Sequence, residues 1–176
     1  MIKIITIAQS EVIILKIKKV ILILILLFLL MLSSCTFHDN TEHINQNSIG
    51  ANMCTTIIEC FNNDDADTLK EMFCNEIKQT HNLDQEIINA FNFVDGTITS
   101  HSRFTISSGK SVEEGIVVDN HIYSVIDNVT TDKKGEYMIV FDCNLIYLQN
   151  ENLVGVLYLK VINNTTGEKI KIGEYV

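Results

Sequence analysis

Five cysteines and five histidines are the side chains of this 176-residue chain best suited to chemistry. Cys35 directly follows two serines. The thiolate form of a cysteine is a nucleophile that can be alkylated to a thioether. Small residues before the cysteine let the backbone enter the active site of a peptidase. No two of the other cysteines have the spacing of zinc ligands, and the chain lacks P-loop, GxSxG and HExxH motifs. The sequence therefore predicts one modified thiol, no metal site and no cofactor.

The segment before Cys35 has the layout of an export signal. Lys16, Lys18 and Lys19 precede the 13-residue apolar run 20–32. That run fits the apolar core of a signal peptide and is shorter than the roughly 20 residues of a membrane span. Leu32-Ser33-Ser34-Cys35 resembles a bacterial lipobox, which implies cleavage between Ser34 and Cys35 and a diacylglyceryl group on Cys35.

We therefore expect residues 1–34 to be a lipoprotein signal peptide. Residues 1–14 add nothing that an export signal needs, and a start at Leu15 would give a compact leader, so they are interpreted as a start-site artefact. The alternative is an uncleaved anchor helix. Both interpretations place the domain outside the cytoplasm, and the lipoprotein interpretation attaches it by a lipid anchor to the extracytoplasmic face of the cell membrane.

The mature chain is strongly acidic. Removing residues 1–34 takes away four lysines and one glutamate, which changes the formal charge from -9 to -12. Nucleic acid and anionic lipid headgroups repel such a surface, so we expect no nucleic-acid partner and attachment to the membrane through acyl chains alone. Residues 35–50 are polar after Cys35 and are interpreted as the lipidated cysteine and a flexible tether.

Helical periodicity marks the first part of residues 51–176, which we expect to form one domain. Apolar residues recur every three or four positions in residues 53–61, 68–74 and 83–91. Between the first two segments, Asn62-Asn63-Asp64-Asp65 should end one helix, and Asp65 or Asp67 can cap the next. These acids lack the glycine and glutamate of an EF-hand loop, so capping explains them better. Three helices are therefore predicted.

Period-two alternation follows from Gly96 onward. Residues 137–147 and 153–161 each have one apolar face, which is typical of half-buried strands, and Gly155 indicates a bulge or a bend. Earlier strands are expected at 98–106 and 116–126, with turns at Ser108-Gly109-Lys110 and Asp132-Lys133-Lys134-Gly135. The predicted fold class is α+β, with three N-terminal helices packed on a curved antiparallel sheet of about four strands.

Several runs of sequence resemble the nuclear transport factor 2-like superfamily. They are Ile57 to Asp65, Leu69 to Phe73 and Phe93 to Ser100. With Thr131-Asp132, Gly135-Glu136-Tyr137 and Val154-Gly155-Val156-Leu157, the chain is most similar to bacterial lipoproteins with the domain of unknown function numbered 5104. The resemblance covers most of residues 50–162. It implies a cone-like, exported and lipid-anchored domain with no established activity, in a Gram-positive bacterium.

Enzymes of that superfamily, such as steroid isomerases and polyketide cyclases, place an Asp or His in the mouth of the cone, where burial shifts its pKa toward neutrality. The core-facing register offers only five candidate pocket residues: Ser100, Ser102, Tyr137, Cys143 and Tyr147. None of them is an acid or base suited to neutral pH. We therefore predict no catalytic residue and a non-enzymatic domain that binds a small apolar ligand or a peptide.

Two other functions remain open. His121 and Asp127 lie on a strand that is apolar on both faces, so one of them could enter the pocket as the base of an isomerase or cyclase. A structural envelope component is the third interpretation. The outward positions of the last two strands are apolar and predict a homodimer: Met138, Val140, Ile146, Val154, Val156 and Tyr158. For Cys54, Cys60, Cys74 and Cys143, free thiols are favoured over a Cys60–Cys74 disulfide.

Overall fold

The computed structural model describes residues 45–174. The predictions for the signal peptide, for Ser34 and Cys35 and for most of the tether lie outside the described residues. Residues 46–50, predicted as the end of the flexible tether, instead begin the first described helix. Within the described range, helices precede strands along the chain, and the fold is α+β with an antiparallel sheet, as predicted. No helix in this range is both long and apolar enough to cross a membrane.

Four helices come first: α2 (Gln46–Asn63), α3 (Ala66–Glu71), α4 (Asn75–Thr80) and α5 (Leu83–Phe93). Helix α2 begins at Asn45, whose side chain accepts a hydrogen bond from the Ser48 N–H, and it ends at Asp64 in the left-handed conformation. Asp65 then caps α3 by accepting from the Thr68 N–H at 3.0 Å. The predicted break and cap are therefore both present, with Asp67 in the first turn of α3.

Helix α4 was not predicted. It is six residues long and buries a single apolar side chain, Ile77, so it leaves no apolar periodicity in the sequence. The helix is held by its surroundings instead. Lys78 Nζ, for example, donates to both the backbone oxygen and the carboxylate of Glu71, at 3.1 and 2.7 Å.

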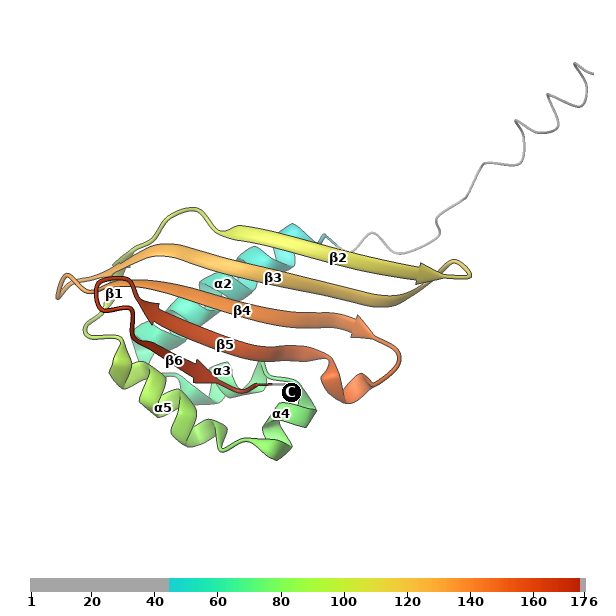
Figure 1. Cartoon of the computed structure of the whole chain (residues 1–176), viewed down its shortest axis with the longest axis horizontal. Coiled ribbons are helices and arrows are strands. Elements are labelled where there is room, and N and C mark those ends of the chain that lie inside the picture. Colours follow the sequence, from blue (N-terminus) through green and yellow to red (C-terminus); the bar gives the residue numbers. More distant parts are fainter. Residues whose placement is uncertain (1–44, 175–176) are drawn as a thin grey trace, which may run out of the picture. The chain divides into compact units, whose positions relative to one another are not determined.

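One antiparallel sheet of six strands follows the helices: β1 (Ile98–Ser100), β2 (Thr105–Glu113), β3 (Ile116–Thr131), β4 (Glu136–Tyr147), β5 (Gly155–Asn163) and β6 (Lys169–Ile172). Strand β3 pairs with β1 near one end and with β2 along the rest of the same edge, and its other edge begins the series β4, β5 and β6. The helices lie on one face of this sheet (Figure 1).

Two predicted details of the strands are wrong. The segment expected as one strand over 98–106 is divided into β1 and the start of β2, and the turn expected at Ser108-Gly109-Lys110 lies inside β2. Gly109 serves a different purpose there, because the imidazole of His121 occupies the space that a side chain at this position would need. The chain turns later, at Glu114 and Gly115, both of which have positive φ.

A bulge corrects the predicted facing of β5. The register between β4 and β5 shifts between Asp142 and Cys143, so that Asp142 pairs with Tyr158 and Cys143 with Val156. Val156 was expected to point outward, but it is buried against the helices at 1% exposure. The register shift leaves Leu157 as the extra residue, two positions after Gly155, where the sequence predicted a bulge or a bend.

Candidate functional site: an apolar groove at one end of the sheet

Helix α2 carries two adjacent stripes of side chains. The first packs into the core and contains Cys54, Ile57 and Phe61, all of them buried. The second lies along the flank of the helix and contains Ile49, Asn52, Met53 and Thr56, at the i, i+3, i+4 and i+7 spacing of one helical face. This second stripe forms one wall of an open hollow of about 440 Å³.

The opposite wall of the hollow comes from β4, from the start of β5 and from the loop after α3. It consists of Met72, Cys143, Asn144, Leu145, Val154 and Gly155. The loop is fixed to β5 by two backbone hydrogen bonds, from Val156 N–H to the Met72 oxygen at 2.8 Å and from Cys74 N–H to the Val156 oxygen at 3.1 Å. The wall therefore depends on a contact between segments about 80 residues apart.

A second open hollow, of about 380 Å³, continues toward the tip of the sheet. Its lining includes Leu145, Tyr147, Leu148, Glu151 and Val154. Because both hollows are lined by Leu145 and Val154, we treat them as one site and call it the end groove. Most of its lining is apolar, and both its size and this composition suit a ligand-binding site.

The only thiol in the lining of the end groove is not reactive at neutral pH. Burial, with smaller contributions from Asp142 and Cys74, raises the pKa of the Cys143 thiol to about 12. Its Sγ lies 3.7 Å from the backbone oxygen of Asn144. The only carboxylate in the lining is that of Glu151, an exposed residue at the outer end. The inner hollow therefore offers amide and hydroxyl groups for hydrogen bonding.

The structure brings only two of the five predicted pocket residues to this site. Cys143 lines the inner hollow and Tyr147 the outer one. Tyr137 is buried, and its hydroxyl accepts from the Asp95 N–H at 3.0 Å. Ser100 and Ser102 lie near β3, where they hydrogen-bond to Thr130 Oγ1 at 2.5 Å and Asn128 Nδ2 at 2.7 Å.

Sequence reasoning missed the side chains that α2 contributes to the groove. Ile49 and Thr56 were not considered, and Met53 was assigned to the core. The signal was present, because Ile49, Met53 and Thr56 continue a helical spacing beside the core stripe. The period alone could not show that the two stripes face different parts of the fold.

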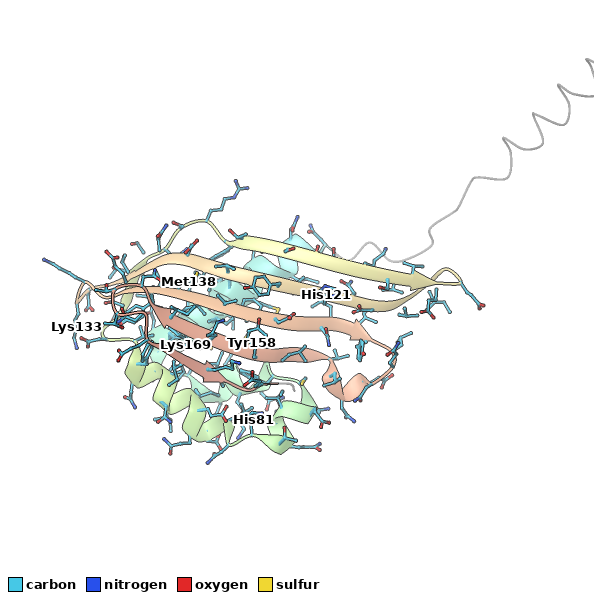
Figure 2. The ribbon with its side chains drawn as sticks, in the orientation of Figure 1. His81, His121, Lys133, Met138, Tyr158 and Lys169 are labelled. Carbon is cyan, nitrogen blue, oxygen red and sulfur yellow. The ribbon has the colours of Figure 1, made fainter. Side chains whose placement is uncertain are left out.

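The sheet face opposite the helices carries a group of titratable side chains. His121 lies over Gly109, with its Nδ1 3.5 Å from Asp119 Oδ2. Burial raises the pKa of Asp142, although the charge of His121 opposes the shift. Burial and the Asp142 charge also raise the pKa of Tyr158, whose ring lies 5.6 Å from Lys171 Nζ. Figure 2 shows His121, Met138, Tyr158 and Lys169 on this face, apart from the helices.

The four described cysteines are buried free thiols in this structure. Within residues 45–174, no three His, Cys, Asp or Glu side chains come together as metal ligands. Neither His121 nor Asp127 belongs to the lining of the end groove.

These features define an α+β domain with an apolar groove between its first helix and one end of its sheet. Residues 56–164, more than half of the chain, match the family described as Domain of unknown function (DUF5104). The chain therefore belongs to this family, as its sequence runs predicted. No curated protein matches the chain.

Proposed function

We propose that the protein is an exported bacterial lipoprotein, anchored through Cys35, whose domain binds a small apolar ligand or an apolar peptide in the end groove. The groove carries this proposal. Its walls come from three separate parts of the chain. Apart from the buried Cys143, the side chains that line it are half-buried or exposed, although many of them are large and apolar. Core packing alone does not require large apolar side chains to gather, exposed, around an open hollow, whereas binding of an apolar ligand does.

The lining favours binding over catalysis. General acid-base catalysis needs a group that titrates near neutral pH within reach of the substrate. The inner hollow offers a thiol with a pKa of about 12 beside amides and a hydroxyl. The alternative of an isomerase or cyclase would require His121 or Asp127 at a pocket, and the third alternative, a structural envelope component, would leave the groove empty.

We also propose that the domain has the fold of the nuclear transport factor 2-like superfamily. Two observations support it: the helices cover one face of the sheet, and register shifts interrupt four of the five strand pairs. Bulges of this kind bend strands, and a bent sheet over helices gives the cone-like shape expected for that superfamily. A groove between the first helix and the sheet end corresponds to the mouth of such a cone.

A homodimer through the open sheet face also belongs to the proposal. Val140 is 2% exposed, and Met138, Ile146 and Tyr158 are half-buried. Lysines lie on β5 and β6, whereas Asp119 and Asp142 lie on β3 and β4, so two copies related by a twofold axis could pair opposite charges. Light scattering on the detergent-solubilised protein tests this, and a monomer would contradict it.

Binding of the neutral dye Nile red to the full chain in detergent-free vesicles tests the groove. Val154→Glu places a carboxylate in the lining, and Ile88→Glu places one on an exposed position of α5. A bound apolar ligand would cover this carboxylate and remove it from water, at a cost of at least about 1.4 kcal/mol, so we expect at least about tenfold weaker binding for V154E. Equal binding by V154E and I88E would contradict a ligand site in the groove.

Native mass spectrometry of the protein from its own host is the complementary test. A stoichiometric extra mass that is lost in V154E and kept in I88E would identify the ligand. A ligand retained equally by both variants would place the site elsewhere in the protein.

A further inference from the structure

Large apolar side chains are exposed mainly at one end of the sheet. Six of them are exposed within the described residues, and four of these lie at the same end. Val112 and Ile116 flank the turn between β2 and β3, Leu148 follows β4, and Val154 precedes β5. The Leu148 N–H donates to the Val118 oxygen at 2.9 Å, which joins the two connections. Figure 1 shows both connections at the same end of the sheet.

The end groove opens among these residues. Leu148 and Val154 belong both to the exposed set and to the outer hollow, and Val154 also lines the inner hollow. The apolar lining is therefore continuous with exposed apolar side chains. We call Val112, Ile116, Leu148 and Val154 the apolar rim.

The described chain begins over the same half of the sheet, three to four residues along β2 and β3 from the rim. Gln46, in the first turn of α2, hydrogen-bonds to Asn120 Oδ1 and, at 3.4 Å, to the Gly109 oxygen. Both partners lie on the part of the sheet next to the apolar rim. Cys35 precedes Asn45 by ten residues, so covalent geometry limits the distance between them to about 35 Å.

We propose that the apolar rim contacts the membrane in which the protein is anchored, and that the end groove binds the acyl chain of a membrane lipid. This inference rests on the proposed lipid anchor and groove. Because the described chain begins on the half of the sheet that carries the rim, a link of only ten residues to an anchor at Cys35 favours this end lying near the bilayer. An open apolar groove that leads to the rim lets an acyl chain enter without crossing water.

The charges around the rim define the lipid headgroup that it accepts. Glu113 and Glu114 lie in the hairpin between Val112 and Ile116, and Glu151 lines the outer hollow near Tyr147. These carboxylates repel anionic headgroups and attract an ammonium group. The ligand is therefore a lipid with a zwitterionic or cationic headgroup.

The chain contains no tryptophan, so a single introduced tryptophan reports its own surroundings. The full lipid-anchored chain is reconstituted in phosphatidylcholine vesicles that contain phosphatidylcholine with a nitroxide on its acyl chain, which quenches nearby fluorescence. Leu148→Trp reports on the rim and Met53→Trp on the groove. Lys133→Trp is the matched control, because Lys133 is exposed in the turn at the opposite end of the sheet (Figure 2).

We expect the nitroxide to quench L148W and M53W severalfold more strongly than K133W, and L148W more strongly in phosphatidylcholine than in phosphatidylglycerol vesicles. Equal quenching of all three variants, in protein that floats with the vesicles, would overturn the inference and leave the anchor standing. Quenching of L148W without M53W would refute the acyl-chain ligand, and Nile red binding in that protein would point to a peptide or another apolar ligand. Protein that does not float would refute the anchor and the inference together.

Discussion

The wall of the end groove leaves no room for a side chain at Gly155, so a single added carbon atom there should disturb it. Its φ is +124°, a conformation that residues with a side chain rarely adopt. A Cβ there would lie 2.8 Å from the backbone nitrogen of Cys74 and 2.9 Å from its Cα. Those atoms belong to backbone that is hydrogen-bonded to β5, so they cannot move away without breaking the contact.

The replacement Gly155→Ala should therefore destabilise the domain through two separate effects. Backbone strain of this kind costs about 1–3 kcal/mol, and overpacking against backbone costs a similar amount, so we expect a loss of about 3 kcal/mol. For a domain of this size the melting temperature should fall by about 10 °C. Circular dichroism during thermal unfolding measures the shift, and Nile red binding measures the accompanying loss of the groove.

Gly167→Ala separates the two effects. Gly167 also has a positive φ, of +76°, but a Cβ there would meet nothing within 4 Å. This control should lose only about 1 kcal/mol, the usual cost of a left-handed residue. If Gly155→Ala lowers the melting temperature no more than Gly167→Ala does, the close contact between β5 and the loop after α3 does not stabilise the fold as we infer.

Three further predictions concern the core and the open face. Asn62→Ala should cost about 1–2 kcal/mol in urea unfolding, against little for the exposed neighbour Asn63→Ala, because Asn62 donates to the Ile98 oxygen at 3.1 Å and accepts from its N–H at 2.8 Å. Asp142→Asn should stabilise the protein at neutral pH, because burial raises the pKa of this carboxyl and disfavours its charged form. The gain in the free energy of unfolding should disappear as the pH falls toward the ordinary pKa of 3.8. A gain that does not depend on pH would contradict this cause. Iodoacetamide at pH 8 should leave the thiols of Cys54, Cys60 and Cys143 unmodified until the protein unfolds, because burial raises their pKa to about 11 or 12. Mass spectrometry before and after the addition of urea would detect early labelling.

Local signals in the sequence were enough to predict the main helices and the long strands. The spacing of Ile57 and Phe61 and the cap at Asp65 are properties of neighbouring residues, and the structure places α2 and α3 accordingly. Helix α4 and strand β6 were not predicted, because they are only six and four residues long and each buries a single apolar side chain. The division of the first predicted strand was missed for the same reason.

Glycines in the strands show where local reasoning fails. Gly109 was interpreted as a turn residue, but it lies inside β2 and leaves room for the ring of His121 on the neighbouring strand. Gly155 was correctly associated with a bulge, yet its consequence for Val156, which moves from the open face to the core, depends on the register with β4. In both cases the deciding contact is made by another strand.

The candidate site was harder to predict than the fold because it consists of what the core leaves uncovered. Helix α2 carries apolar side chains on two adjacent stripes, although the second also contains Asn52 and Thr56, and the sequence gives both stripes the same period. Ile57 meets the sheet, whereas Met53 meets the gap that remains between the sheet and the loop after α3. That gap exists because Gly155 allows the loop to join β5 close to Cys74, so its position is set by a contact between residues far apart in the chain. A helical face wider than its core contact is thus a signal that a groove adjoins the helix, although only the tertiary structure shows what forms the other wall.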